Sequence, residues 1–199
     1  MKQFFISVII LLLSLPSVAA DRPDPLTLVK ATADRVLHEV QVHKTTMQSD
    51  NSIVYSIVNT HVLPHFDFEY MTRSAVGRYW RKANDAQKQA LQEEFSRLLV
   101  KTYGVALLNY SGQEIIYMPL KPSNDDDRVM VETKVAENNG GPQIPVNYRL
   151  RFKDSDWKEY DVVIDGISLV SNYRSSFASQ IRRSGIDGLI DELAKRNKG

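Results

Sequence analysis

Histidine and carboxylate side chains are the main candidates for metal or acid–base chemistry, because the chain has four histidines and no cysteine. His61 and His65 have the spacing of two ligands on one helix face, but Pro64 lies between them and would end such a helix. His38 and His43 would lie on different faces of a helix. We therefore predict no metal site.

Acidic residues form two further candidate groups. The run Asn-Asp-Asp-Asp at 124–127 offers oxygen ligands for calcium, but it lacks the glycine and the distal glutamate of a calcium-binding loop, so we predict a solvated turn. Glu159, Asp161 and Asp165 alternate with apolar residues, which predicts that they lie on the face of a strand that points to water. An exposed carboxylate is a poor general base for an apolar substrate.

The sequence also lacks the common catalytic and cofactor motifs. It contains no Gly-x-Ser-x-Gly elbow, no phosphate-binding loop, no dinucleotide fingerprint and no His-Glu-x-x-His. Thiol catalysis and cysteine metal sites are ruled out by the absence of cysteine. We predict that the protein is not an enzyme and has no catalytic residue and no cofactor.

A basic and aromatic segment is a candidate binding surface for an anionic group. Guanidinium groups bind carboxylate or phosphate oxygens, and aromatic rings beside them provide amphipathic anchors. The alternative is a solvated loop that covers the core, with a tryptophan packed beneath it. The residues selected as candidates are Arg73, Arg78, Trp80 and Arg81.

The first twenty residues have the pattern of a signal peptide. Lys2 supplies a positive start, Phe4 to Leu15 form an apolar stretch, and Val18-Ala19-Ala20 provides a site for cleavage. The apolar stretch is shorter than the roughly 20 residues of a membrane span. We expect cleavage of residues 1–20 and a mature protein free in solution; the alternative is a retained membrane anchor.

Composition limits the remaining possibilities. The chain has 25 Lys and Arg against 24 Asp and Glu, a net charge of +1, and such a balance argues against nucleic-acid binding. Residues 21–199 are enough for one domain with a sizeable core. Stability must come from that core, because no disulfide is available.

Periodic apolar residues predict helices in the first half of the chain. We expect helices over 25–47, 52–63 and 68–76, the second ending before Pro64 and the third at Gly77. Asn84 caps a longer helix that continues to about residue 110. Its second half is apolar on all sides, so we expect it to be buried on several sides, with a close contact at Gly104.

After residue 112 the apolar period changes to that of strands. We expect strands over 113–120, 129–135, 146–153 and 157–164, with a loop at 138–142, and helices over 172–183 and 186–193. The predicted fold is α+β: an antiparallel four-stranded sheet (about 113–171) packed against N- and C-terminal helices. One face of this sheet is apolar and the other is charged.

Seven features occur in order along nearly the whole mature chain. They are Pro-His-Phe-Asp-Phe-Glu-Tyr-Met-Thr-Arg at 64–73, Val-Gly-Arg-Tyr-Trp-Arg at 76–81, Leu-Val-Lys-Thr-Tyr at 99–103, Trp-Lys-Glu-Tyr-Asp at 157–161, Gly-Ile-Ser-Leu-Val-Ser-Asn-Tyr-Arg at 166–174, Phe177, and Gly-Ile-Asp-Gly-Leu-Ile at 185–190. Together they resemble the MlaC family, also called the toluene-tolerance Ttg2D family.

The resemblance implies a periplasmic phospholipid-binding shuttle of an ABC-type intermembrane lipid transport system. Its implied partners are an inner-membrane ABC transporter complex with its substrate-binding subunit and an outer-membrane lipoprotein–porin complex. Exchange of phospholipid between them would maintain the lipid asymmetry of the outer membrane. The family implies no catalytic residues, and it implies a ligand cavity between sheet and helices.

An acyl chain of about 15 methylenes gains on the order of 12 kcal/mol by burial, so a carrier must offer a dry cavity. The apolar strand faces would form its walls and the many-sided helix end its roof; Arg73, Arg78, Trp80 and Arg81 would bind the headgroup or dock a partner. The alternative is that these apolar side chains fill a core. The candidate lining residues are Tyr103, Leu107, Tyr110, Val129, Val131, Val146, Tyr148, Leu150, Val162 and Ile164.

Two other functions stay open at this point. One is a small-molecule enzyme of the cone-shaped α+β type, which requires an ionisable side chain at the bottom of an apolar pocket. The other is an adaptor that bridges membrane complexes without a ligand.

Overall fold

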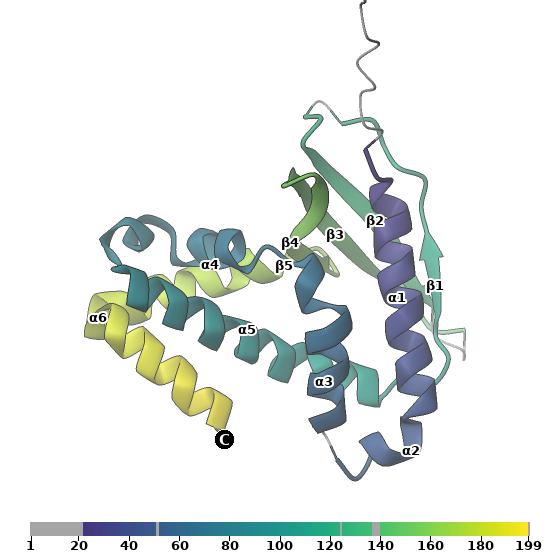
Figure 1. Ribbon diagram of the computed structural model, residues 1–199, viewed down its shortest axis with the longest axis horizontal. Coiled ribbons are helices and arrows are strands. Elements are labelled where there is room, and N and C mark those ends of the chain that lie inside the picture. The colour runs from purple at the N-terminus through teal and green to yellow at the C-terminus, as the bar shows by residue number, and fades with distance from the viewer. Residues whose placement is uncertain (1–21, 51, 124, 137–139, 199) are drawn as a thin grey trace, which may run out of the picture.

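The computed structural model describes residues 22–198 apart from residue 51, residue 124 and residues 137–139 (Figure 1). The predicted signal peptide at 1–20 lies outside the described residues. So do Asn124 of the predicted solvated turn and part of the predicted loop at 138–142.

The helices follow the predicted order. Asp24 caps the first by accepting hydrogen bonds from the backbone amides of Leu26 and Thr27. The predicted helix over 25–47 is divided at His43, and the next helix ends at His61, before a 3-10 turn that contains Pro64. The elements are α1 (Pro25–Val42), α2 (Lys44–Met47), α3 (Ser52–His61), η1 (Leu63–His65), α4 (Phe68–Val76), η2 (Gly77–Lys82), α5 (Asp85–Leu108) and α6 (Leu169–Lys198), which is interrupted at Gly185.

The long helix α5 forms as its sequence predicts. Asn84 and Gln87 make a reciprocal capping box at its start. Near its end α5 packs closely on α3: a Cβ placed on Gly104 would lie 3.3 Å from Cγ1 of Val54. The predicted close contact at this glycine is therefore confirmed.

The sheet has five strands in the order β1-β2-β3-β4-β5, and all neighbouring pairs are antiparallel. The predicted α+β class is confirmed, but the prediction of four strands was wrong by one. Asp165 and Gly166 adopt positive φ angles, and this tight turn folds two further residues back onto β4. The strands are β1 (Glu114–Tyr117), β2 (Arg128–Ala136), β3 (Ile144–Lys153), β4 (Asp156–Ile164) and β5 (Ile167–Ser168).

A β-bulge in β4 overturns the predicted alternation of its acidic residues. Leu150 of β3 pairs with Glu159, whereas the preceding Arg149 pairs with Asp161, so Tyr160 is the extra residue. The two acids consequently lie on opposite faces. Neither faces water, since Glu159 is 2% and Asp161 is 3% exposed.

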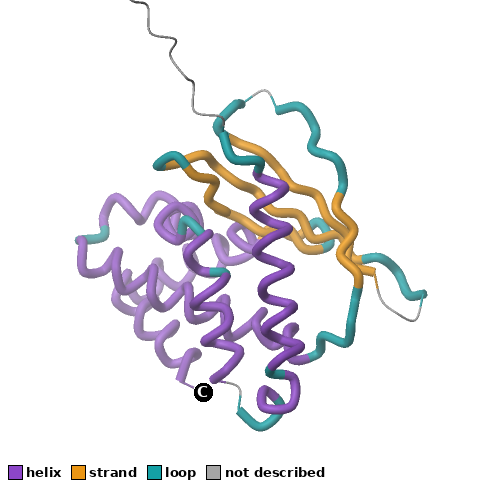
Figure 2. The backbone as a smooth tube through the Cα atoms, turned by 45° about the vertical axis from the view of Figure 1, so that its right-hand side comes forward, coloured by secondary structure: helices purple, strands orange, loops and turns teal. Residues whose placement is uncertain are grey.

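Helix α1 crosses one face of the sheet, which we call the inner face, while α4, α5 and α6 form a helical group to one side (Figures 1 and 2). The buried residues form three separate clusters. The helical core includes Met71, Leu91, Leu99, Phe95, Phe177 and Leu189; the α1–α3 core includes Val36, Val40, Val54, Ile57, Val58 and Val100; the sheet core consists of Val29, Val131, Leu150 and Trp157.

Asp67 joins the start of α4 to the sheet. Its side chain accepts a hydrogen bond from the amide of Tyr70, and its Oδ2 lies 3.4 Å from Nη1 of Arg151 and 3.7 Å from Nζ of Lys153. Its own amide donates to the carbonyl oxygen of Glu159 over 2.8 Å. The helical group is thus attached to the charged face opposite the inner face, which we call the outer face, and to the edge of β4 at Glu159.

Asp161 makes the second connection, from the outer face of β4 to the start of α6. Its carboxylate accepts hydrogen bonds from Nη1 of Arg149 (3.0 Å), Oγ of Ser168 (2.6 Å) and the amide of Val170 (3.1 Å). A buried carboxylate is stable only with such partners, so each of these bonds matters for the attachment.

We expect Asp161→Ala to lower the free energy of unfolding by about 3 kcal/mol, because it leaves three donors without their acceptor. Chemical denaturation followed by circular dichroism measures this change. Asp126→Ala is the control, since Asp126 is exposed. The hydrogen bond from Arg22 is accepted by the backbone carbonyl oxygen of Asp126, which the substitution retains. Equal stabilities of the two variants would contradict this role for Asp161.

Candidate functional site

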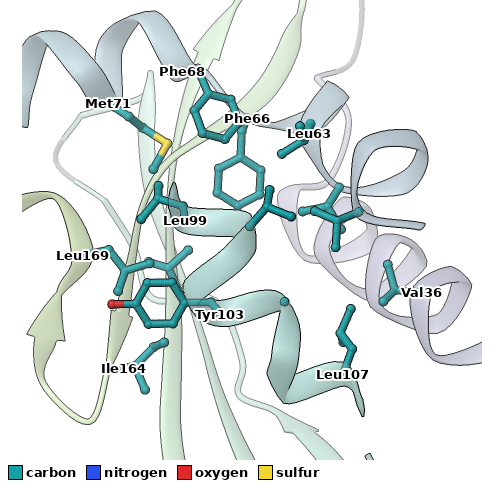
Figure 3. Close-up of a pocket in the computed structure, with 15 residues that line it drawn as sticks. Val36, Leu63, Phe66, Phe68, Met71, Leu99, Tyr103, Leu107, Ile164 and Leu169 are labelled. Atoms are coloured by element: carbon teal, nitrogen blue, oxygen red, sulfur yellow. The ribbon is translucent and has the colours of Figure 1, made fainter. Parts of the chain in front are cut away.

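An apolar pocket of about 220 Å³ lies between β4 and the helices (Figure 3). Phe66 and Phe68 enter it from one side, and Tyr103 and Leu107 of α5 from the other. We call this space the first pocket. Its lining comprises Val36, Val58, Val62, Leu63, Phe66, Phe68, Met71, Leu99, Val100, Tyr103, Gly104, Leu107, Val162, Ile164 and Leu169.

A second pocket of about 180 Å³ lies between α1 and the inner face of the sheet. It shares four lining residues with the first pocket, so the two are neighbouring compartments with a common wall. The shared residues are Val36, Val62, Phe66 and Leu107, and the others are Val29, Thr32, Ala33, Leu37, Ile115, Tyr148 and Glu159.

The pockets lie where the three cores meet without closing on one another. The lining of the first pocket includes members of the helical core and of the α1–α3 core, and the second includes members of the α1–α3 core and the sheet core. Native interiors are otherwise densely packed, with few voids larger than a water molecule. Enclosed cavities with apolar linings stay dry and can take up hydrocarbon ligands.

Local sequence explains how the aromatic wall of the first pocket is positioned. Asp67 is held by the outer face of the sheet, and its neighbours Phe66 and Phe68 both line the pocket. Their rings stack with centroids 5.7 Å apart. At the opposite wall Gly104 lines the pocket at the point where α5 packs closely on α3.

Glu159 is the only carboxyl among the described residues that line the two pockets. Its carboxyl has no hydrogen bond and no ion pair with any of the described residues. Burial raises the pKa of this carboxyl from 4.5 to about 8. The pKa of the neighbouring Tyr148 is raised by its own burial and by the charge of Glu159. Glu159 is therefore a neutral acid at pH 7.

The structure brings five of the ten predicted lining residues to the pockets. Tyr103, Leu107, Val162 and Ile164 line the first, and Leu107 and Tyr148 line the second. Their role in binding a ligand stays a prediction.

The other five predicted residues line neither pocket. Val131 and Leu150 are completely buried in the sheet core, and Val129 packs against it. Tyr110 packs against the α1–α3 core, and Val146 is a partly buried residue of β3. Val129, Val131 and Leu150 therefore belong to a filled core, which was the alternative to a cavity wall.

Sequence reasoning missed the contributions of α1, α3, η1 and α4, and it placed Glu159 in water. Two signals were available. Apolar residues surround Pro64 on both sides, from Val62 to Phe68, which is unusual for a solvated turn. Trp157 stands two residues before Glu159, and residues with this spacing share one face of a strand.

The candidate anion-binding residues are only partly brought together. Arg73, Trp80 and Arg81 line a surface groove of about 470 Å³ with Tyr70, Ser74, Gly77 and Arg174, which we call the basic groove. Arg78 instead lies over the ring of Tyr79, 5.1 Å from its centroid. Phe68 and Met71 of α4 face the first pocket, so the basic groove and the pocket lie on different sides of this helix.

No group of three or more His, Cys, Asp or Glu side chains within the described residues is placed to hold a metal ion. His65 is partly buried, with its Nδ1 unpartnered, and burial together with the charge of Lys158 lowers the pKa of its ring. Among the described helices, none is both long and apolar enough to cross a membrane.

Fold and site together define an α+β protein with paired apolar compartments, and comparison with known proteins identifies its family. The profile of the MlaC protein family matches residues 30–195. The chain therefore belongs to the MlaC family, and the resemblance seen in the sequence is confirmed.

Individual relatives agree with this assignment. The toluene tolerance protein Ttg2D of Pseudomonas putida is 32% identical over 194 residues, covering 94% of this chain and 89% of the relative. The intermembrane phospholipid transport system binding protein MlaC of Haemophilus influenzae is 26% identical over 171 residues, covering 85% and 80%. A solved structure of a phospholipid-binding protein from Ralstonia solanacearum, in complex with a phospholipid, superposes with a TM-score of 0.82 at 33% identity, covering 88% of this chain and 98% of that one.

The raised pKa of Glu159 predicts a pH dependence of stability. Between about pH 4.5 and pH 8 the unfolded chain loses this proton while the folded protein keeps it, so ionisation favours unfolding. The free energy of unfolding should fall by up to about 1.4 kcal/mol for each pH unit in this window. Glu159→Gln should remove that contribution.

Denaturation of both proteins at several pH values measures the difference between them. We expect the variant to be the more stable protein at pH 8 and the difference to shrink towards pH 4.5. Parallel pH profiles of the wild type and Glu159→Gln would show that Glu159 titrates normally.

Proposed function

We propose that this protein is a periplasmic phospholipid-binding shuttle of an ABC-type intermembrane transport system. The observation that carries the proposal is the pair of adjoining apolar pockets in a fold shared with a phospholipid-bound relative. The protein would exchange phospholipid between inner- and outer-membrane complexes and so maintain outer-membrane lipid asymmetry. Its location would be the periplasm, reached through the predicted signal peptide at 1–20.

Two compartments with a common wall fit the two acyl chains of a phospholipid. Each methylene that leaves water for an apolar wall gains about 0.8 kcal/mol, so a chain is held mainly by its length. The lining of the first pocket has no charged group to compensate a phosphate. We infer that the headgroup stays near the surface, because burying an unpaired charge is costly.

Exchange between similar apolar environments needs little net free energy, so direction would come from the partner complexes. The proposed partners are the inner-membrane ABC transporter complex with its substrate-binding subunit and the outer-membrane lipoprotein–porin complex. The basic groove is a candidate docking surface for one of them. Its separation from the first pocket by α4 favours docking over headgroup binding for Arg73 and Arg81.

The enzyme alternative gains one observation, because Glu159 provides an ionisable side chain in an apolar pocket. Acid–base chemistry usually needs a second group of different pKa beside the first. Within the described residues no His, Asp or further Glu lines either pocket. We therefore retain lipid transport as the proposed function.

Leu107→Trp tests the pockets directly, because Leu107 lines both of them and a larger ring there would occupy ligand space. We expect at least a tenfold loss of phospholipid taken up from liposomes, measured by solvent extraction and mass spectrometry. Val105→Trp is the matched control on the same helix, since Val105 is 49% exposed. Unchanged uptake by Leu107→Trp, or no phospholipid in the wild type, would contradict the proposal.

Charge reversal tests the basic groove. We expect Arg73→Glu and Arg81→Glu each to weaken binding to one of the purified partner complexes about tenfold, and more at low salt, because an acidic partner surface would be repelled. Lys82→Glu is the control, since this neighbouring exposed residue is not among those that line the groove. Biolayer interferometry measures the affinities. Equal losses in all three variants would indicate a general charge effect instead of a docking site.

A further inference from the structure

The second pocket differs from the first in having polar groups on its sheet wall. Glu159 and Tyr148 both line it, and the remaining lining residues are apolar except for Thr32. The carboxyl of Glu159 is almost completely buried and has no hydrogen-bond partner among the described residues. A hydrocarbon chain alone would give this carboxyl nothing to bind.

Strand register places a third polar group on the same inner face. Tyr117 of β1 pairs with Thr133 of β2, and Tyr148 of β3 pairs with Val131 of β2. Because Val131 and Thr133 are two residues apart on one strand, Tyr117 and Tyr148 lie on the same face of the sheet. The hydroxyl of Tyr117 is buried and has no partner in the described part of the chain. Burial, and then the negative charge of Asp34, raise the pKa of Tyr117 to about 12. Tyr148 is close enough to both Glu159 and Tyr117 to be influenced by their charges.

An unpaired buried polar group destabilises the folded state, and native proteins seldom leave such groups unpaired. Of the buried polar groups on this face of the sheet, Glu159 and Tyr148 line the second pocket, whereas Tyr117 lies beside them outside its lining. At pH 7 the neutral carboxyl of Glu159 and the hydroxyl of Tyr148 are both hydrogen-bond donors. Their natural counterpart is an uncharged oxygen acceptor.

We propose that Glu159, with Tyr148, forms a hydrogen-bonding subsite in the second pocket that binds an uncharged oxygen of the lipid. This oxygen is either a glycerol ester carbonyl or an oxygen carried by the acyl chain itself. The subsite rests on the proposed function and adds a specificity to it. The protein would select lipids that carry an uncharged oxygen at this position over hydrocarbon chains of the same length.

The test compares two phosphatidylglycerols of equal chain length, one with two ester-linked chains and one with two ether-linked chains, which lack the carbonyl oxygens. Purified, delipidated protein is offered equal amounts of both in mixed liposomes, and the bound ratio is measured by mass spectrometry. A third lipid, ether-linked with one hydroxyl in the chain, separates the two sources of oxygen.

We expect the wild type to prefer the diester lipid, or the hydroxylated ether lipid, about tenfold over the plain ether lipid. Preference for the diester assigns the subsite to the ester carbonyl, and preference for the hydroxylated lipid assigns it to a chain oxygen. Glu159→Leu should abolish the preference while still binding lipid, and Glu159→Gln should retain most of it, because an amide still donates. Glu132→Gln is a control at an acid that pairs with Lys121 at the surface.

Equal binding of all three lipids by the wild type would overturn the subsite, as would a preference that survives in Glu159→Leu. Thermal unfolding of each variant confirms that it is folded before binding is compared. If the wild type binds none of the lipids, the proposed function fails and the subsite fails with it. If it binds them without discrimination, only the subsite fails.

Discussion

The attachment of the helices to the sheet through Asp67 and Asp161 is the interaction on which the pockets depend. Both carboxylates are buried; Asp67 forms ion pairs with Arg151 and Lys153 of β3, and Asp161 accepts a hydrogen bond from Arg149 of the same strand. The helical group is therefore held from behind, and the inner face of β4 remains free to form a wall. Because Asp67 is fixed in this way, Phe66 and Phe68 on either side of it are directed into the first pocket. A polar contact on one side of the chain thus positions the apolar wall on the other.

Three cores instead of one are the energetic consequence. The cores share α1 and α5, but each is packed around its own buried side chains, as α4, α5 and α6 pack around Phe95, so stability does not require the space between the cores to be filled. A single interlocked core would gain more packing energy, but it would leave no room for a ligand. A bound acyl chain would then bury the apolar surface that remains accessible between the cores after folding. Glu159, on the wall of that space, keeps its proton because burial opposes its charge.

Much of the fold could be predicted because local signals and tertiary structure agree. The helix over 68–76 follows from its apolar period, and the capping box of α5 begins at the predicted Asn84. The pocket could be predicted only in part, because Val131 and Val162 look alike in sequence although one is fully packed and the other lines the pocket. Periodicity assigns a residue to a face of a strand, and the depth of packing at that face is decided by elements distant in sequence. The bulge at Tyr160 was missed for a similar reason: one extra residue reverses the predicted face of Glu159, and no turn residue marks it.

Photo-crosslinking with a phospholipid that carries a diazirine in one acyl chain tests the central claim most directly. After loading and illumination, peptide mass spectrometry identifies the residues that contact the chain. We expect labelling to concentrate on pocket residues such as Phe66, Tyr103 and Leu107, and to be absent from Val131 and Leu150 in the sheet core. Labelling confined to the protein surface, or spread evenly over exposed apolar residues such as Val42 and Ile167, would contradict the account.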